Sequence, residues 1–373
     1  MKNMFKLASL LAAAVMLFAC EKEDPTGDIM IISDKDVIQS NGSDVATLKV
    51  MVGDKDVTAD AVIYDENNNE LSLADGKFTA DKDGEYKFWA TYGTLTTYNK
   101  SVAGNNLFVI KAISVAVPDP ASDTKPENTS FVHRAFLTQY TGTGCGYCPY
   151  MMQQLFALKD DGTIPSKAVH AASHSGYNTS DPAKISAPPS PDNYPYLTVD
   201  LSQGYSHSAG IKTLRSLIDN SASTTAKAGL SVNPVYYEKE RLRVVIVAVK
   251  AAEAGIFNVG AWLLEDNIYG QQSDYDGIKR QDPDHDYDTH NNCLRVADSY
   301  FKGTYFGHYL GEMMSGDVLY KTFVMNVKKD WKKENLHLAV FASSGVKEGS
   351  TLKYTVCNAV DAPIDAPTPF EYK

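Results

Sequence analysis

The chain has 373 residues, of which 43% are hydrophobic and 22% are charged, and its formal net charge is −11. This length exceeds what one typical hydrophobic core accommodates, so we expect two or three domains. A negative surface of this kind repels nucleic acid and anionic lipid, so neither is an expected partner of the folded surface.

The first twenty residues predict export. A short basic start is followed by an apolar run from Leu7 to Phe18, and the small Ala19 then precedes Cys20. This pattern is typical of a signal peptide, residues 1–19, and is too short for a transmembrane helix. Its end resembles a bacterial lipobox, which implies that Cys20 is lipidated, although Phe18 is bulkier than usual at its position. An ordinary secretory signal with an unmodified Cys20 is the alternative.

Lipidation predicts a membrane location. We expect residues 20–28 to be a lipidated tether that anchors the chain to the outer membrane, facing the periplasm or the exterior. Glu21–Asp24 resembles the acidic tags that send some lipoproteins to the outer face, and a simple solvated tether is an equal alternative. Loss of the two lysines of the signal peptide lowers the net charge to −13, so the lipid is the predicted membrane contact.

The next region predicts a spacer. Residues 29–117 alternate apolar and polar positions, as in Ala46, Leu48 and Val50, and turn formers such as Asp83–Gly84 interrupt the runs. The region resembles bacterial immunoglobulin-like domains, which implies a small antiparallel β-sandwich. Residues 118–130 then concentrate proline, serine and charge, which is typical of a linker.

A pair of cysteines follows the linker. FVHRAFLTQY (131–140) predicts a strand, TGTGCGYCPY (141–150) carries Cys145 and Cys148, and the helix that Pro149 opens has apolar residues at a helical spacing. A second strand is predicted for KAVHAASH (167–174). This strand, C-x-x-C, helix, strand order is the context of a thioredoxin-like redox motif, so we expect residues 131–225 to form a thioredoxin-like α/β domain.

Two further residues are candidates for the site. Pro195 precedes a predicted strand, where thioredoxin-like folds keep a cis-proline facing the cysteines, and Pro188, Pro189 and Pro191 are alternatives for that role. His174 ends the second strand at the edge where parallel sheets bind ligands, so it is a candidate catalytic base. A hydrogen-bonded structural histidine is the alternative.

Residues 226–373 return to alternation, for example at Leu242, Val244 and Ile246, which predicts a C-terminal β-rich domain. The predicted fold class is therefore multidomain α+β: an N-terminal immunoglobulin-like β-sandwich, a thioredoxin-like α/β domain and a C-terminal β-sandwich. Cys293 and Cys357 lie on separate predicted strands of an oxidising compartment. They form either a structural disulfide or two buried free thiols.

Several motifs together are similar to the twenty-eight-kilodalton outer membrane protein family of lipoproteins. These are TGTGCGYCP, WLLEDNIYGQQ, HNNCLRVA and VCNAV, within about residues 131–360. The resemblance implies a thioredoxin-like core with a β-rich continuation and an outer-membrane location, but no established substrate. Gln139 stands where members commonly carry a carboxylate, and Gly144 where thioredoxin-like sites usually have tryptophan. Both departures weaken the expectation of reductase activity, whereas Gly146–Tyr147 matches periplasmic disulfide isomerases.

The predicted function is thiol–disulfide exchange on exported proteins, by a thiol–disulfide oxidoreductase or isomerase. If the helix begins at Cys145, its dipole lowers the pKa of that thiol; we expect Cys145 to be the attacking residue, with Cys148 resolving. The alternative is a surface binding or adhesion lipoprotein whose cysteines form a permanent disulfide. No cofactor is expected, since zinc at the pair needs further ligands and the acidic residues 282–290 lack the glycine and terminal glutamate of a calcium loop.

Overall fold

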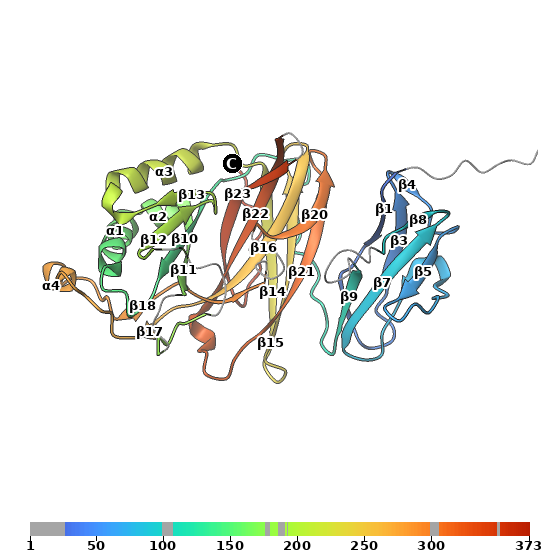
Figure 1. The fold of residues 1–373 in the computed structure, drawn as a ribbon, viewed down its shortest axis with the longest axis horizontal. Coiled ribbons are helices and arrows are strands. Elements are labelled where there is room, and N and C mark those ends of the chain that lie inside the picture. Colours follow the sequence, from blue (N-terminus) through green and yellow to red (C-terminus); the bar gives the residue numbers. More distant parts are fainter. Residues whose placement is uncertain are drawn as a thin grey trace, which may run out of the picture. The chain divides into compact units, whose positions relative to one another are not determined.

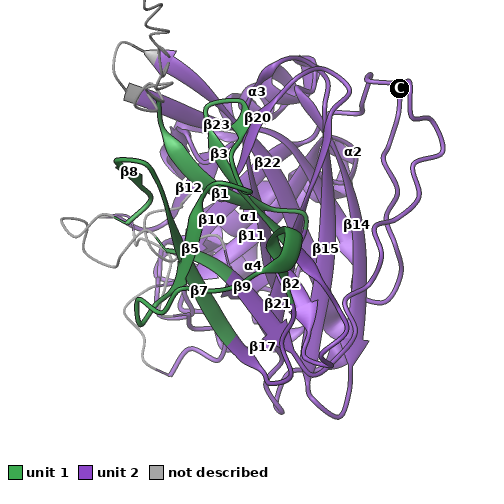
Figure 2. Cartoon of the chain, turned by 90° about the vertical axis from the view of Figure 1, so that its right-hand side faces the viewer, with its two compact units in different colours: residues 1–34, 47–78, 85–109 green, residues 35–46, 79–84, 110–373 purple. Residues whose placement is uncertain are grey.

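A computed structural model describes residues 27–98, 107–175, 180–185, 191, 193–298, 306–348 and 351–373. The predicted signal peptide, Cys20, Pro188 and Pro189 lie outside the described residues. The chain divides into two compact units, residues 1–34, 47–78 and 85–109 and residues 35–46, 79–84 and 110–373 (Figure 2). In the described parts of both units, no helix has the length and apolar character needed to cross a membrane.

The first unit consists of short antiparallel strands in two sheets. One sheet holds β1 (Ile29–Ser33), β3 (Ala46–Val52), β4 (Lys55–Asp56) and β6 (Lys77–Phe78), and the other includes β5 (Val62–Asp65), β7 (Gly84–Tyr92) and β8 (Leu95–Thr96). A short 3₁₀ helix, η1 (Ala74–Gly76), precedes β6. The predicted alternation is confirmed along β3, where Leu48 and Val50 are buried and Lys49 is exposed.

The second unit is organised around a nine-stranded mixed sheet (Figure 1). Its order is β13-β12-β10-β11-β19-β16-β22-β23, and β20 pairs with β16 beside this path. The strands are β10 (Ala135–Thr141), β11 (Ala168–His174), β12 (Tyr196–Val199), β13 (Gln203–Tyr205), β16 (Gly255–Glu265), β19 (Cys293–Ala297), β20 (His308–Met313), β22 (Leu336–Glu348) and β23 (Thr351–Pro363).

The predicted strand–helix–strand unit is present within this sheet. β10 and β11 are parallel and are joined through α1 (Cys148–Asp160) and α2 (Thr163–Lys167). The helical spacing places Met151, Leu155 and Leu158 of α1 in a core that also receives Leu214 and Ile218 from α3 (Ile211–Ser223). This core fixes the position of α1, and with it the turn that carries the cysteine pair.

The predicted fold class is nevertheless wrong. The described residues form twenty-three strands and four α-helices, so the chain is predominantly β and not an α+β protein with a separate thioredoxin-like α/β domain. The sheet does not end at β11, because β11 pairs in parallel with β19 through Ala172 and Cys293, and β19 pairs with β16. A free edge at β11 leaves backbone groups unpaired, whereas here the Ala172 amide donates to the Asn292 carbonyl at 2.8 Å.

A second, three-stranded antiparallel sheet covers part of the large one. It consists of β14 (Ala228–Tyr237), β15 (Leu242–Ala251) and β21 (Val318–Asn326). Apolar residues of both sheets, such as Val245, Val247, Phe257 and Val340, share one buried cluster. The smaller elements are β2 (Val37–Gln39), β9 (Phe108–Ile113), β17 (Ile268–Tyr269), β18 (Thr289–His290), α4 (Ile278–Gln281), η2 (His207–Ala209) and η3 (Lys333–Asn335).

The segment predicted to be a linker, residues 118–130, is bound to this second sheet. The Lys250 ammonium, 1% exposed, lies 2.9 Å from a carboxylate oxygen of Asp123 and donates to the carbonyl of Lys125 at 3.2 Å and to that of Pro126. A buried ammonium requires such partners because it loses its hydration. These contacts hold the middle of the segment in one conformation.

Candidate functional site

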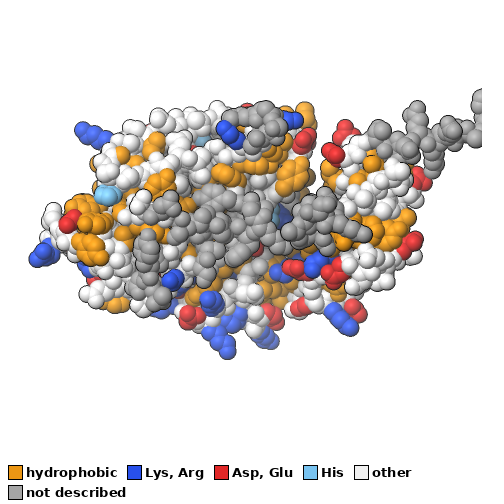
Figure 3. Space-filling view, viewed as in Figure 1, with side chains coloured by type: hydrophobic (Ala, Val, Ile, Leu, Met, Phe, Trp, Pro, Cys, Tyr) orange, Lys and Arg blue, Asp and Glu red, His pale blue; other side chains and the backbone are white. Residues whose placement is uncertain are grey.

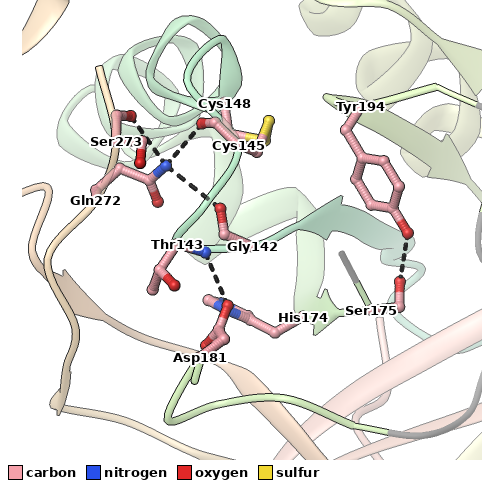
Figure 4. Close-up of a disulfide and its surroundings, with 10 residues drawn as sticks. All are labelled: Gly142, Thr143, Cys145, Cys148, His174, Ser175, Asp181, Tyr194, Gln272 and Ser273. Atoms are coloured by element: carbon pink, nitrogen blue, oxygen red, sulfur yellow. Dashed lines mark hydrogen bonds and ion pairs between the residues drawn. A yellow bond between two sulfur atoms is a disulfide. The ribbon is translucent and has the colours of Figure 1, made fainter. Parts of the chain in front are cut away.

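The cysteine pair lies in the turn between β10 and α1 (Figure 4). Cys145 and Cys148 form a disulfide, with their Cα atoms 5.3 Å apart. The Cys145 amide donates to the Gly142 carbonyl at 3.0 Å, and the Cys148 amide donates to the Cys145 carbonyl at 3.1 Å. Two successive turns therefore bring the cysteines to disulfide distance at the end of the strand.

The two cysteines differ in burial. Cys148 is 0% exposed, whereas Cys145 is partly exposed between the exposed residues Gly144 and Tyr147. The helix α1 begins at Cys148, one residue before Pro149, so Cys145 lies three residues outside it. The helix therefore starts next to Pro149, as predicted, and the condition that it begins at Cys145 is not met. The helix dipole acts less strongly on Cys145 for this reason, because its effect falls off within one turn.

A glutamine from a distant segment holds the turn in place. The Gln272 side chain, 2% exposed, donates from Nε2 to the Cys145 carbonyl at 2.8 Å and to the Gly142 carbonyl at 3.3 Å. Gln272 lies in the stretch after β17, 127 residues downstream of Cys145. These bonds give each of the two carbonyls a second donor, in addition to the backbone amide that each already accepts.

The residues after Gln272 continue this contact through their backbone. The Ser273 amide donates to the Thr143 carbonyl at 2.8 Å, and the Tyr275 amide donates to the Gly146 carbonyl at 3.0 Å. A side chain at Gly146 requires the Tyr275 ring to move, because a Cβ atom there meets that ring at 2.4 Å. We call residues 272–275 the clamp segment, since it runs beside the cysteine turn and bonds to it repeatedly.

A buried carboxylate contacts the turn from the other side. Asp181, 7% exposed, accepts the Thr143 amide at 2.7 Å and the Ala183 amide at 2.9 Å. Its carboxylate oxygens also lie 3.0 and 3.1 Å from Nδ1 of His174. Burial raises the pKa of Asp181, but hydrogen bonds from His174, Thr143 and Ala183 outweigh burial and lower it to about 2. Asp181 is thus an ionised group that links His174 to the turn.

His174, the candidate base, lies between two buried partners. It is 1% exposed at the end of β11, and its Nε2 lies 3.7 Å from Sγ of Cys293 while Nδ1 faces Asp181. Its connection to the cysteine turn therefore passes through Asp181 and Thr143 (Figure 4). The arrangement resembles that of a positioned structural histidine, and the predicted catalytic role of His174 remains a prediction.

Pro195 lies at the same end of the sheet as the cysteine turn. The Tyr194–Pro195 peptide bond is cis, as expected for this proline. Tyr196 pairs with Tyr140 on β10, so Pro195 lies beside the point where β10 leads into the turn. Tyr194 is hydrogen-bonded to Ser175 at 2.9 Å, which connects the segment before Pro195 to the end of β11 (Figure 4).

The structure does not bring Cys293 and Cys357 together. Both are free, buried thiols, and the disulfide considered for them is not formed. Cys293 packs with Ala183 and Ile268, whereas Cys357 belongs to the core between the nine-stranded and the three-stranded sheet. Burial raises the pKa of both thiols, that of Cys357 to about 12, so both are poor nucleophiles at neutral pH.

Gln139 lies on β10, six residues before Cys145 in the sequence. Its side chain is 4% exposed and lines a cavity of about 690 Å³ together with Thr141, His174 and residues of α1. The position is on β10, as predicted, opposite Ala172 of β11.

Sequence reasoning missed the two residues that contact the turn most closely. Gln272 is the last residue of WLLEDNIYGQQ, which entered only as part of a family resemblance, and no spacing rule connects it with a turn 127 residues earlier. Asp181 stands in an Asp-Pro pair, which indicates only a turn. A contact of this range follows from the pairing of β11 with β19, which has no local sequence signal.

Comparisons with known proteins place the chain only coarsely. No protein-family model matches it, and no curated protein matches it significantly. Among solved structures, HBP35 of Porphyromonas gingivalis is 16% identical with a TM-score of 0.45, over 64% of this chain and 78% of that one. A protein of Agrobacterium tumefaciens is 11% identical with a TM-score of 0.39, over 62% of this chain and 94% of that one.

With TM-scores below 0.5, these likenesses carry no argument about fold or function. The resemblance to the twenty-eight-kilodalton lipoprotein family, drawn from short motifs, stays a prediction. The chemistry of the site has to follow from its own geometry.

Proposed function

We propose that the chain is a thiol–disulfide exchange protein that acts on exported proteins through Cys145 and Cys148. The observation that carries the proposal is the unequal burial of the pair, one sulfur-bearing residue partly exposed and the other fully buried. Exchange needs an accessible attacking thiol and a protected resolving thiol next to it. A purely structural disulfide does not require one accessible and one protected cysteine.

In the reducing direction, the Cys145 thiolate attacks one sulfur of a client disulfide. A mixed disulfide forms between Cys145 and the client, and the other client sulfur leaves as a thiolate. Cys148, as a thiolate, then attacks Sγ of Cys145 and releases the second client thiolate, which regenerates the Cys145–Cys148 disulfide. The client gains two electrons and the cysteine pair loses them, and the reverse sequence oxidises a client.

The test is capture of the mixed disulfide. Cys148→Ser removes the resolving thiol, so a client remains covalently bound to Cys145, and non-reducing electrophoresis of envelope fractions is expected to show adducts that dithiothreitol removes. Cys145→Ser is the matched control and is expected to show none. If the reduced Cys145 resists alkylation at neutral pH and Cys148→Ser captures no client, the proposal fails.

A second candidate function is surface binding by a protein whose cysteine pair is a permanent disulfide. The clamp segment favours it, because Gln272, Ser273 and Tyr275 all donate to carbonyls of the turn and restrict its movement. Under this alternative, replacement of both cysteines lowers the stability of the protein but leaves the side chains of its binding surface unchanged. The capture experiment separates the two functions.

We also propose that the protein is an outer-membrane lipoprotein anchored through Cys20, so that its partners are the membrane lipid and the thiols or disulfides of exported proteins. The support is the signal sequence with its terminal cysteine. Intact-mass analysis of the purified envelope protein is expected to give a mature chain that begins at an acylated Cys20. An unmodified chain that begins elsewhere contradicts the anchor.

A further inference from the structure

Two tyrosine rings lie exposed beside the disulfide. Tyr147, between the two cysteines in sequence, is 49% exposed, and Tyr275 of the clamp segment is 68% exposed. Their ring centroids are 5.3 Å apart in an edge-to-face arrangement. Gly146 makes this contact achievable, because its missing side chain leaves the space that the Tyr275 ring occupies. We call Tyr147 and Tyr275 the tyrosine pair.

The stretch that carries Tyr275 is strongly acidic. Residues 270–290 contain six aspartates against Lys279 and Arg280, a net charge of −4 with histidine neutral. Lys279 is paired with Asp288 at 2.5 Å, so these two residues contribute no net charge and the excess negative charge comes from the other aspartates. Asp276, next to Tyr275, is exposed and accepts a hydrogen bond from Tyr150 at 3.0 Å. Around α4 this face carries hydrophobic side chains beside charged ones (Figure 3).

Together, the tyrosine pair and the acidic residues next to it form a surface that favours cationic and aromatic groups. Tyr147 and Tyr275 form an exposed pair of adjoining rings next to the cysteines, and ring faces attract cations as well as other rings. Carboxylates around the rings strengthen the attraction for a cation and repel an acidic segment. The partly exposed Cys145 stands directly beside this surface, so a bound segment places its own cysteine within reach.

We propose that the tyrosine pair and the acidic residues next to it bind an extended client segment that carries lysine or arginine and an aromatic residue near its cysteine. The inference rests on the proposed exchange function and specifies its substrate class. Tyr147 and Tyr275 hold the aromatic or cationic side chain of the client, and the aspartates around Tyr275 select for positive charge. Acidic segments are rejected.

The test compares exchange rates for synthetic peptide disulfides. One peptide has lysine and phenylalanine next to its cysteine, a second has glutamate in place of lysine, and hydroxyethyl disulfide is the small neutral reference. We expect the basic peptide to react roughly tenfold faster than the acidic one, and this ratio to shrink as ionic strength rises to about 0.5 M, because salt screens exposed charges.

Single substitutions test whether the preference for the basic peptide arises from the tyrosine pair and the acidic residues next to it. Tyr275→Ala and Asp276→Asn are each expected to lower the ratio of the basic-peptide rate to the hydroxyethyl disulfide rate by roughly threefold or more. Tyr309→Ala is the matched control, since Tyr309 is 60% exposed but lies on β20, remote from α4 in Figure 1. It is expected to leave the ratio unchanged.

Failure of the inference is distinct from failure of the proposed function. Exchange with hydroxyethyl disulfide but equal rates for both peptides overturns the surface preference and leaves exchange intact. If no disulfide reacts, a fluorescently labelled, cysteine-free version of the basic peptide tests the surface alone by anisotropy. Binding that Tyr275→Ala weakens and Tyr309→Ala does not supports the surface, and no difference between the peptides overturns it.

Discussion

At the scale of single residues, Asp200 shows how burial changes acid–base behaviour outside the cysteine turn. It follows β12 with a positive φ of 55° and is 4% exposed. Its carboxyl oxygens accept the Phe136 amide at 2.9 Å and the Ser221 hydroxyl at 2.6 Å. Burial outweighs these hydrogen bonds and raises the pKa of Asp200 to about 6.

This raised pKa predicts a pH dependence of stability. Between about pH 4 and pH 6 the unfolded chain loses the Asp200 proton while the folded chain keeps it, so the free energy of unfolding falls as pH rises through this window. The full effect is at most about 3 kcal/mol at pH 7. Asp200→Asn removes the titration, and its amide oxygen still accepts from Phe136. We expect the variant to gain about 1–3 kcal/mol relative to the parent between pH 4 and pH 7.

Urea denaturation of both proteins at pH 4, 5, 6 and 7 measures this difference. Asp219→Asn is the control, because Asp219 is an exposed carboxylate on α3 paired with Lys167. Parallel pH profiles for the parent and Asp200→Asn would show that the buried carboxyl does not titrate in this window.

At the scale of elements, the clamp segment explains why the cysteine turn keeps its conformation. The turn belongs to a loop between β10 and α1, and its carbonyls lie outside both elements. The clamp segment supplies donors to them from another part of the chain. Local sequence around Cys145 therefore specifies the turn only in part, and residues 272–275 complete it.

This role gives a prediction for Gln272→Ala. The change removes the side-chain donor to the Gly142 and Cys145 carbonyls, which keep their backbone donors. We therefore expect a loss of about 0.5–1.5 kcal/mol in the free energy of unfolding and faster reduction of the disulfide by dithiothreitol. Gln271→Ala is a matched control, because Gln271 is exposed. Equal effects of the two substitutions on stability and on reduction rate exclude the clamp role of Gln272.

The sequence predicted elements of this kind well where the signal was local. Pro149 and the spacing of Met151, Leu155 and Leu158 predicted α1, and the structure begins that helix at Cys148, one residue earlier. The strand predicted for residues 167–174 is β11, Ala168–His174. Helical periodicity relates residues three or four positions apart, and β-alternation relates residues two positions apart. Both patterns can therefore be recognised in the sequence.

At the scale of the whole molecule, the predicted fold class was wrong, because the order of strands in a sheet depends on residues that are far apart in the sequence. Alternation along residues 242–248 predicted β15, but nothing in that pattern states which sheet a strand joins. Ala172 of β11 pairs with Cys293 of β19, more than a hundred residues later in the chain. This pairing joins strands of the predicted thioredoxin-like domain and strands of the predicted C-terminal domain into one sheet. The predicted separate α/β domain is absent from the described chain for this reason.

Residues 118–130 give a further prediction at this scale. Composition predicted a linker, and the contacts of Lys250 with Asp123 and two carbonyls bind it to the second sheet. Lys250→Met removes these contacts, so we expect faster cleavage by endoproteinase Glu-C within the segment and a loss of about 1–3 kcal/mol in the free energy of unfolding.

Lys227→Met is the control for this prediction, because Lys227 forms an exposed ion pair with Glu253 at 3.1 Å, a kind of pair that contributes little. If Lys250→Met is cleaved no faster than Lys227→Met, the segment is held by other contacts.

The reduction potential of the Cys145–Cys148 pair tests the central proposal most directly. The folded protein is equilibrated with dithiothreitol or glutathione redox buffers, free thiols are alkylated, and the reduced fraction is measured by mass spectrometry. Exchange on exported proteins predicts a value between roughly −270 and −120 mV, the range of catalytic pairs. A value below about −300 mV contradicts exchange and identifies the pair as a structural disulfide.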